Sequence, residues 1–79
     1  MTDEYNNQTP DINLAAYVIA HGHPIVKGER QGKKVFFCFN VPNADWQKHQ
    51  TDFFGSKGKV VALDFVNALR ALKSLVHIV

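Results

Sequence analysis

The sequence predicts an α+β domain in which helices pack on one face of a small antiparallel hairpin. Residues 60–76 are the longest periodic apolar segment and have the stripe of an amphipathic helix. Residues 25–30 and 33–40 have strand-like composition on either side of Gln31-Gly32, and residues 12–21 form a shorter apolar segment with capping residues. The expected order is therefore α-β-β-α-(β)-α.

Length and composition indicate one small domain in residues 9–79, after a tail in residues 1–8 that has no periodicity. The hydrophobic content of 46% is too high for a disordered chain. Cys38 is the only cysteine, so no disulfide forms, and a lone thiol fits a reducing compartment. The N-terminus is polar and acidic, and no run approaches the roughly 18 apolar residues of a membrane span. We expect a cytoplasmic protein with no membrane segment.

The charge is unevenly distributed along the chain. The formal net charge is +2, from nine basic and seven acidic residues. Asp3, Glu4 and Asp11 lie in the first eleven residues, so residues 12–79 carry nine bases against four acids, a balance of +5. This balance suits an anionic partner such as nucleic acid, although many other soluble proteins share it.

The first helix is expected over residues 12–21. Thr9 and Asp11 are both candidate N-caps, and Pro10 fits the first helical position if Thr9 is the cap. Gly22 is the expected left-handed residue at the end of this helix, and Pro24 prevents its continuation.

The hairpin register follows if Gln31-Gly32 is a two-residue loop. One face then carries Val26, Val35, Phe37 and Phe39 and meets the helices. The other face carries Ile25, Lys27, Glu29, Lys34, Phe36 and Cys38. The expected pairs are Arg30 with Lys33, Glu29 with Lys34, Gly28 with Val35, Lys27 with Phe36, Val26 with Phe37, and Ile25 with Cys38.

Asn43 is expected to cap a second helix over residues 44–54 whose inner side carries Trp46, Phe53 and Phe54. Residues 55–58 are a loop, and residues 59–61 are a short extended piece beside the hairpin. The last helix is expected to pack on the hairpin's inner face with the first helix alongside. Its predicted inner stripe is Phe65, Val66, Leu69, Leu72 and Val76, and its predicted outer residues are Asp64, Asn67, Arg70, Lys73 and Ser74.

Two stretches carry a resemblance to a known family. They are DINLAAY at residues 11–17, followed by Gly22, and FVNALRALKSL at residues 65–75. Phe37-x-Phe39 and the aromatic residue before Gly55 lie between them. Over residues 11–76 the chain resembles a family of small bacterial and phage-encoded domains whose function is uncharacterised. The resemblance implies a compact accessory protein of a bacterium or mobile element, and it assigns no catalytic residue.

No motif predicts a metal site, a cofactor or catalysis. The potential metal ligands His21-x-His23, Cys38, His49 and His77 lack the paired spacing of structural zinc sites. Cys38 lies in the middle of a strand between two phenylalanines, where a cysteine is a small apolar residue rather than a nucleophile. Residues 55–59 lack the phosphate-loop pattern. We therefore predict that the protein is not an enzyme.

The hairpin's outward face is the predicted binding site. Phe36 lies among Lys27 and Lys34, with Arg30 and Lys33 at the turn, and such a mixture of aromatic and cationic residues is typical of proteins that bind single-stranded nucleic acid. Arg70 and Lys73, together with Lys57 and Lys59, are a second candidate basic patch, although a charged solvated face is the commoner meaning of such residues.

An alternative uses the same face for protein contact. Phe36, Ile25 and Cys38 would form an apolar patch that a second copy of the chain covers, giving a homodimer, or that another protein occupies. The first prediction is a nucleic-acid-associated binding module, and the second is an accessory or inhibitor protein.

Overall fold

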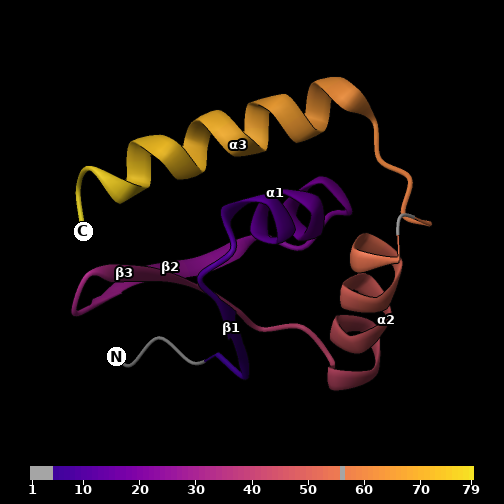
Figure 1. The fold of residues 1–79 in the computed structure, drawn as a ribbon, viewed down its shortest axis with the longest axis horizontal. Helices are drawn as coiled ribbons and strands as arrows, with labels where there is room; N and C mark the ends of the chain where they lie inside the picture. The colour runs from indigo at the N-terminus through magenta and orange to yellow at the C-terminus, as the bar shows by residue number, and fades with distance from the viewer. Residues whose placement is uncertain (1–4, 56) are drawn as a thin grey trace.

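The computed structural model describes residues 5–55 and 57–79 and contains one three-stranded antiparallel sheet. Strands β1 (Asn7–Thr9), β2 (Ile25–Gln31) and β3 (Lys34–Phe39) lie in the order β1-β3-β2, so β3 is central (Figure 1). Helices α1 (Ile12–Ala20), α2 (Asn43–Phe54) and α3 (Ala62–Val76) complete the fold. The predicted α+β class is confirmed, with the observed order β-α-β-β-α-α.

Strand β1 includes Asn7 and Gln8, which were predicted to be part of a tail. It pairs with β3 through Asn7↔Phe39, Gln8↔Cys38 and Thr9↔Phe37. The amides of Asn6 and Asn7 also donate to the Val41 carbonyl at 2.7 and 3.0 Å. The strand is polar and has no alternating hydrophobic pattern, so it is held mainly by these pairings, and Thr9 is its one buried residue. Residues 1–4 of the predicted tail lie outside the described residues.

The hairpin faces were predicted correctly except at the start of β2, although the register was wrong. The loop is Gly32-Lys33, one residue later than expected, because Gly32 takes the positive φ of 63° that a tight hairpin turn needs. Glu29 therefore pairs with Phe36 instead of Lys34, a shift of two residues that keeps each side chain on its predicted face. An irregularity between Ile25 and Lys27 then places Ile25 opposite Phe39.

Helix α1 is buried almost throughout. Asp11, not Thr9, is its N-cap, and its carboxylate accepts hydrogen bonds from the backbone N–H groups of Asn13 and Leu14 at 2.9 and 3.2 Å. Pro10 therefore precedes the helix. Gly22 has φ +94°, as predicted for the residue that ends this helix. The five residues from Leu14 to Val18 are all buried, which is typical of a helix enclosed on several sides.

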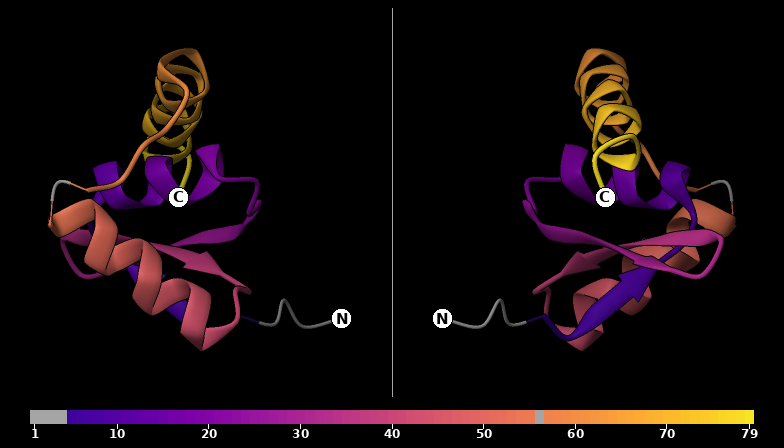
Figure 2. Two further views of the ribbon diagram at one scale, coloured as in Figure 1. Left: turned by 90° about the vertical axis from the view of Figure 1, so that its right-hand side faces the viewer. Right: turned by 90° about the vertical axis from the view of Figure 1, so that its left-hand side faces the viewer.

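Helix α3 was predicted to pack on the hairpin. It packs mainly on α1 instead. The sheet, α1 and α3 are stacked in that order (Figure 2). Ala68 and Leu72 of α3 are buried in the core, whereas Val66, predicted to face inward, is 41% exposed. The reason is that α1 is apolar on nearly all sides and lies between the sheet and much of α3, which reaches β2 only near its end, where Leu75 lies against Gly28.

Helix α2 lies beyond one end of the sheet, where Trp46 is buried against Phe39 with ring centroids 5.6 Å apart (Figure 1). Asn43 is its first residue and does not cap it. Its side-chain oxygen instead accepts from the amide of Asn7 at 3.2 Å. Phe54, predicted to face inward, is 63% exposed.

The segment between α2 and α3 joins no sheet. The short extended piece predicted at residues 59–61 is not a strand. Within the described residues, none of the helices is long and apolar enough to cross a membrane.

Candidate functional site

The candidate site is the face of the sheet that points away from α1 and α3, here called the outer face. In the views of Figure 2 both helices lie on the opposite side of the sheet. The outer face carries alternate residues of the three strands together with Tyr5, which precedes β1. Its members are Tyr5, Gln8, Lys27, Glu29, Gln31, Lys34, Phe36 and Cys38.

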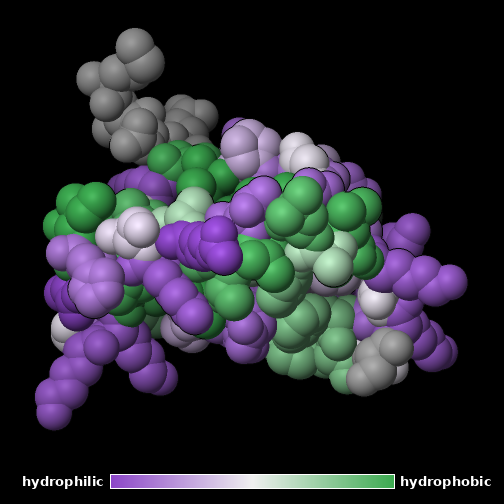
Figure 3. Space-filling model, turned by 90° about the horizontal axis from the view of Figure 1, so that it is seen from above, coloured by the Kyte–Doolittle hydropathy of each residue, from purple (hydrophilic) through white to green (hydrophobic). Residues whose placement is uncertain are grey.

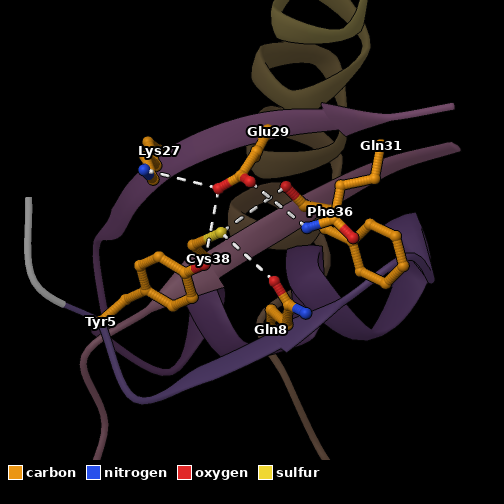
Figure 4. Close-up of polar contacts among 7 residues, drawn as sticks. All are labelled: Tyr5, Gln8, Lys27, Glu29, Gln31, Phe36 and Cys38. Carbon is orange, nitrogen blue, oxygen red and sulfur yellow. Dashed lines mark hydrogen bonds and ion pairs between the residues drawn. The ribbon is translucent and has the colours of Figure 1, made fainter.

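Glu29 is the centre of a polar network on this face (Figure 4). Lys27 Nζ lies 3.5 Å from Glu29 Oε2, and the Tyr5 hydroxyl donates to the same oxygen at 3.4 Å. Gln31 Nε2 donates to Glu29 Oε1 at 3.4 Å, and Lys27 Nζ also lies 5.3 Å from the centre of the Tyr5 ring. Glu29, the one carboxylate among the described residues of the outer face, is therefore engaged by its own neighbours and partly offset by Lys27.

Cys38 lies on the outer face but is covered. Its side chain is fully buried, and its Sγ lies 3.9 Å from both Gln8 Oε1 and the Phe36 carbonyl (Figure 4). Burial, followed by the charge of Glu29, raises the pKa of this thiol. A protonated, buried thiol is a poor nucleophile, which agrees with the prediction that Cys38 is a small apolar residue.

Tyr5 is held as a hydrogen-bond donor. The negative charge of Glu29, followed by desolvation, raises the pKa of its phenol. The phenol therefore keeps its proton at neutral pH and stays beside Glu29, with its ring available on the outer face.

The structure brings four of the seven predicted site residues together. Lys27, Lys34 and Phe36 share the outer face, and Lys33 is exposed in the adjoining turn. Phe36 is half-buried and lies opposite Glu29. These four residues define the part of the predicted site that remains contiguous.

Arg30 lies apart from them because it pairs with Val35 on the inner face. Its Nε donates to the Val79 carbonyl at 2.9 Å, and its Nη2 donates to the Val76 carbonyl at 3.3 Å. The guanidinium thus satisfies carbonyl groups at the end of α3, where a positive charge is also favoured by the helix dipole.

Arg70 and Lys73 are exposed on α3, which lies on the side of the sheet opposite the outer face (Figure 2). They are therefore not part of the outer face.

Sequence reasoning missed Tyr5 and Gln8 as members of the outer face. Both lie in the polar N-terminal stretch, where no periodicity signals a strand. The one available signal was Tyr5 itself, an aromatic residue in an otherwise polar segment.

A second cluster lies where the end of α1 meets α2. The ring centroid of His49, on α2, is 5.1 Å from that of His21 and 5.1 Å from that of His23. Tyr17 underlies the cluster, with its ring centroid 4.4 Å from His21 and 5.8 Å from His49. Burial, followed by the charges of His21 and His23, lowers the pKa of His49.

The apolar surface in the described residues lies away from the outer face. Leu63 and Val61 are 67% and 64% exposed, and with Val66 they form what is here called the apolar area at the start of α3. Figure 3, which views the molecule from the α3 side, shows apolar side chains gathered over this end of the helix. An open groove of about 480 Å³ runs between α1 and α3, lined by Ile19, Ala20, Gly22, Asp64, Asn67 and Ala68.

Comparison of the chain with models of protein families, with curated proteins and with solved structures found no match.

Proposed function

We infer that the protein is a non-enzymatic binding module that holds a single-stranded nucleic acid against the outer face. Phe36 and Tyr5 provide aromatic surfaces for bases, while Lys27, Lys33 and Lys34 provide cations for phosphates. Base–aromatic stacking is worth about 1–3 kcal/mol per base and tolerates different sequences. Open sheet faces with this mixture of side chains are used by many single-strand binders.

The observation that carries this proposal is the extent of burial of the three apolar residues that were predicted on the hairpin's outward face. Ile25 packs against the core and Cys38 is buried, so Phe36 is the one of the three that remains accessible. A face whose aromatics, Phe36 and Tyr5, lie among lysines and a carboxylate is too polar for a typical dimer contact. It suits base stacking combined with phosphate contacts.

Charge on the outer face also supports the proposal. Within residues 5–55 and 57–79, Lys27, Lys33 and Lys34 outnumber the single outer-face carboxylate, Glu29, which is already engaged by Lys27 and Tyr5. An incoming phosphate therefore meets Lys33 and Lys34, which pair with no carboxylate of these described residues.

Fluorescence anisotropy with labelled DNA and RNA oligonucleotides tests this function. We expect binding at low salt that weakens steadily as salt is added. A protein that is folded but leaves the anisotropy of every oligonucleotide unchanged at low salt would refute the proposal.

The second candidate function is protein contact, and the occupant we propose is a second copy of the chain. The supporting observation is the apolar area, where Leu63 and Val61 are each about two-thirds exposed. Apolar patches rimmed by polar residues mark interaction sites, and two-fold homodimers are the commonest oligomers. Light scattering should report a dimer that Leu63→Glu converts to a monomer. A monomer at high concentration would exclude this candidate without affecting the first.

A further inference from the structure

We propose that His21, His23 and His49 form a binding site for a divalent first-row transition-metal ion of the zinc class. The three side chains come from two elements far apart in the sequence, the end of α1 and the middle of α2. The proposal is independent of the outer face and of any nucleic acid bound there.

The separations between the rings carry the argument. His49 lies 5.1 Å, centroid to centroid, from each of the other two histidines. Two imidazoles on one tetrahedral zinc ion, with Zn–N distances of about 2.0–2.1 Å, have ring centroids about 5 Å apart. His49 therefore already stands at a ligand-like separation from both His21 and His23.

The local fold explains why these rings meet. His21 is the C-cap of α1, and the left-handed Gly22 reverses the chain so that the His23 N–H donates to the Val18 carbonyl at 3.4 Å. Both histidines are thus held at the end of α1 that packs on α2. The ring of Tyr17 packs against the ring of His21, with centroids 4.4 Å apart.

Metal binding requires a small rearrangement. Within residues 5–55 and 57–79, no three ligand side chains yet surround one point. His21 is exposed and His23 is half-buried, so their rings can turn toward His49 without disturbing the core. Moving a side chain between staggered rotamers is inexpensive compared with the energy of metal binding.

The surroundings of His49 favour a ligand role. Asp45 lies one turn before it and Asp52 one turn after it on α2, where a carboxylate can accept the second ring N–H or complete the coordination. Imidazole ligands suit zinc, copper and nickel.

Bound metal would join α1 to α2 and so stabilise the fold. In a chain of 79 residues without a disulfide, such a link adds to a small core. Any ion that binds the folded state alone raises the melting temperature.

Cobalt(II) is the probe, and protein that carries no histidine tag is the sample. We expect the intense visible absorption of tetrahedral cobalt to saturate at one ion per chain, and Zn²⁺ to displace it. His21→Gln, His23→Gln and His49→Gln should each weaken Zn²⁺ affinity by about tenfold or more. His77→Gln is the matched control because His77 caps the far helix α3 and should leave affinity unchanged.

Zn²⁺ should also raise the melting temperature of the unaltered protein, and this shift should shrink in the three site variants and persist in His77→Gln. Since His49 packs against Tyr17, His49→Gln is interpreted only if its circular dichroism matches that of the parent protein. If the circular dichroism of His49→Gln differs, the proposal is tested by His21→Gln and His23→Gln alone. Absence of the cobalt absorption, or equal losses in the site variants and His77→Gln, would overturn the proposal.

Discussion

Gly58 lies against the ring of Tyr17 so closely that a Cβ at position 58 would meet ring carbons Cε2 and Cζ at 2.7 Å. The contact ties the segment before α3 to the central helix α1. The same Tyr17 ring contacts Phe53 of α2, with centroids 5.5 Å apart. Tyr17 therefore joins α2 and the segment that precedes α3 to α1.

Gly58→Ala should lower the free energy of unfolding by about 1–3 kcal/mol, because a rigid aromatic ring must move to admit the methyl group. Urea unfolding monitored by circular dichroism measures the change. Lys57→Ala, an exposed neighbour in the same segment, is the control and should change stability by less than about 0.5 kcal/mol. Equal stabilities of the two variants would show that the Tyr17 contact is not tight.

Arg30 should matter for stability and not for nucleic-acid binding. Arg30→Ala removes its hydrogen bonds to the Val76 and Val79 carbonyls and should cost about 0.5–1.5 kcal/mol. Oligonucleotide affinity of the folded variant should fall no more than that of Lys48→Ala, which removes an exposed lysine on α2. A larger loss of affinity in Arg30→Ala would place this side chain in the binding site instead.

Stability should fall in alkaline solution through Cys38. Its thiol has a pKa that burial raises above the ordinary value of 9.0, so the folded state keeps the proton after the unfolded state has lost it. This contribution is fully present below about pH 9 and is lost as pH rises through the folded pKa. Urea unfolding on both sides of that pH should show the decline, and Cys38→Ala should reduce it.

Thiol reactivity checks the same point independently. In the folded protein Cys38 should react with an alkylating reagent far more slowly than in urea, since the thiol is buried and protonated. Reaction in the native protein at the rate of a free thiol would contradict the burial of Cys38.

Much of the fold follows from local signals in the sequence. Gly22 ends α1 as predicted, Leu72 is buried as predicted, and each residue from Lys27 to Phe39 named in the prediction lies on its expected hairpin face. These features depend on glycine conformation and on side-chain periodicity, which a sequence displays directly.

The predictions of the fold were wrong where contacts between segments remote in the sequence determine the structure. Strand β1 is polar and gains its partner only from β3, and Val66 is exposed because α3 packs mainly on α1 and not on the hairpin. The irregularity beside Ile25 turns that residue inward, which no pattern in the strand reveals.

The candidate site was predictable in part, where side-chain alternation along the strands determines which residues share a face. Lys27, Lys34 and Phe36 alternate along two strands, so the pattern shows that they share a face. Tyr5 joins them through β1, and Arg30 leaves them for the end of α3. Both outcomes depend on segments that are remote in sequence. His49 likewise meets His21 and His23 only through the packing of α2 on α1.

The central claim is that Phe36 and the lysines of the outer face bind single-stranded nucleic acid. The most direct measurement is the salt dependence of oligonucleotide affinity, by fluorescence anisotropy, for the unaltered protein and three variants. Lys34→Ala removes a cation without disturbing the Lys27–Glu29 pair, Phe36→Leu removes only the aromatic face, and Lys48→Ala is the control.

With phosphate contacts from Lys33 and Lys34, the two lysines outside the Lys27–Glu29 pair, the slope of log affinity against log salt should be about −1.4, and Lys34→Ala should make it shallower by about 0.7. Phe36→Leu should weaken binding by about tenfold or more while leaving the slope unchanged, because stacking releases no counterions. Lys48→Ala should bind like the unaltered protein. An identical slope and affinity in all four proteins, or no binding at low salt, would contradict the account.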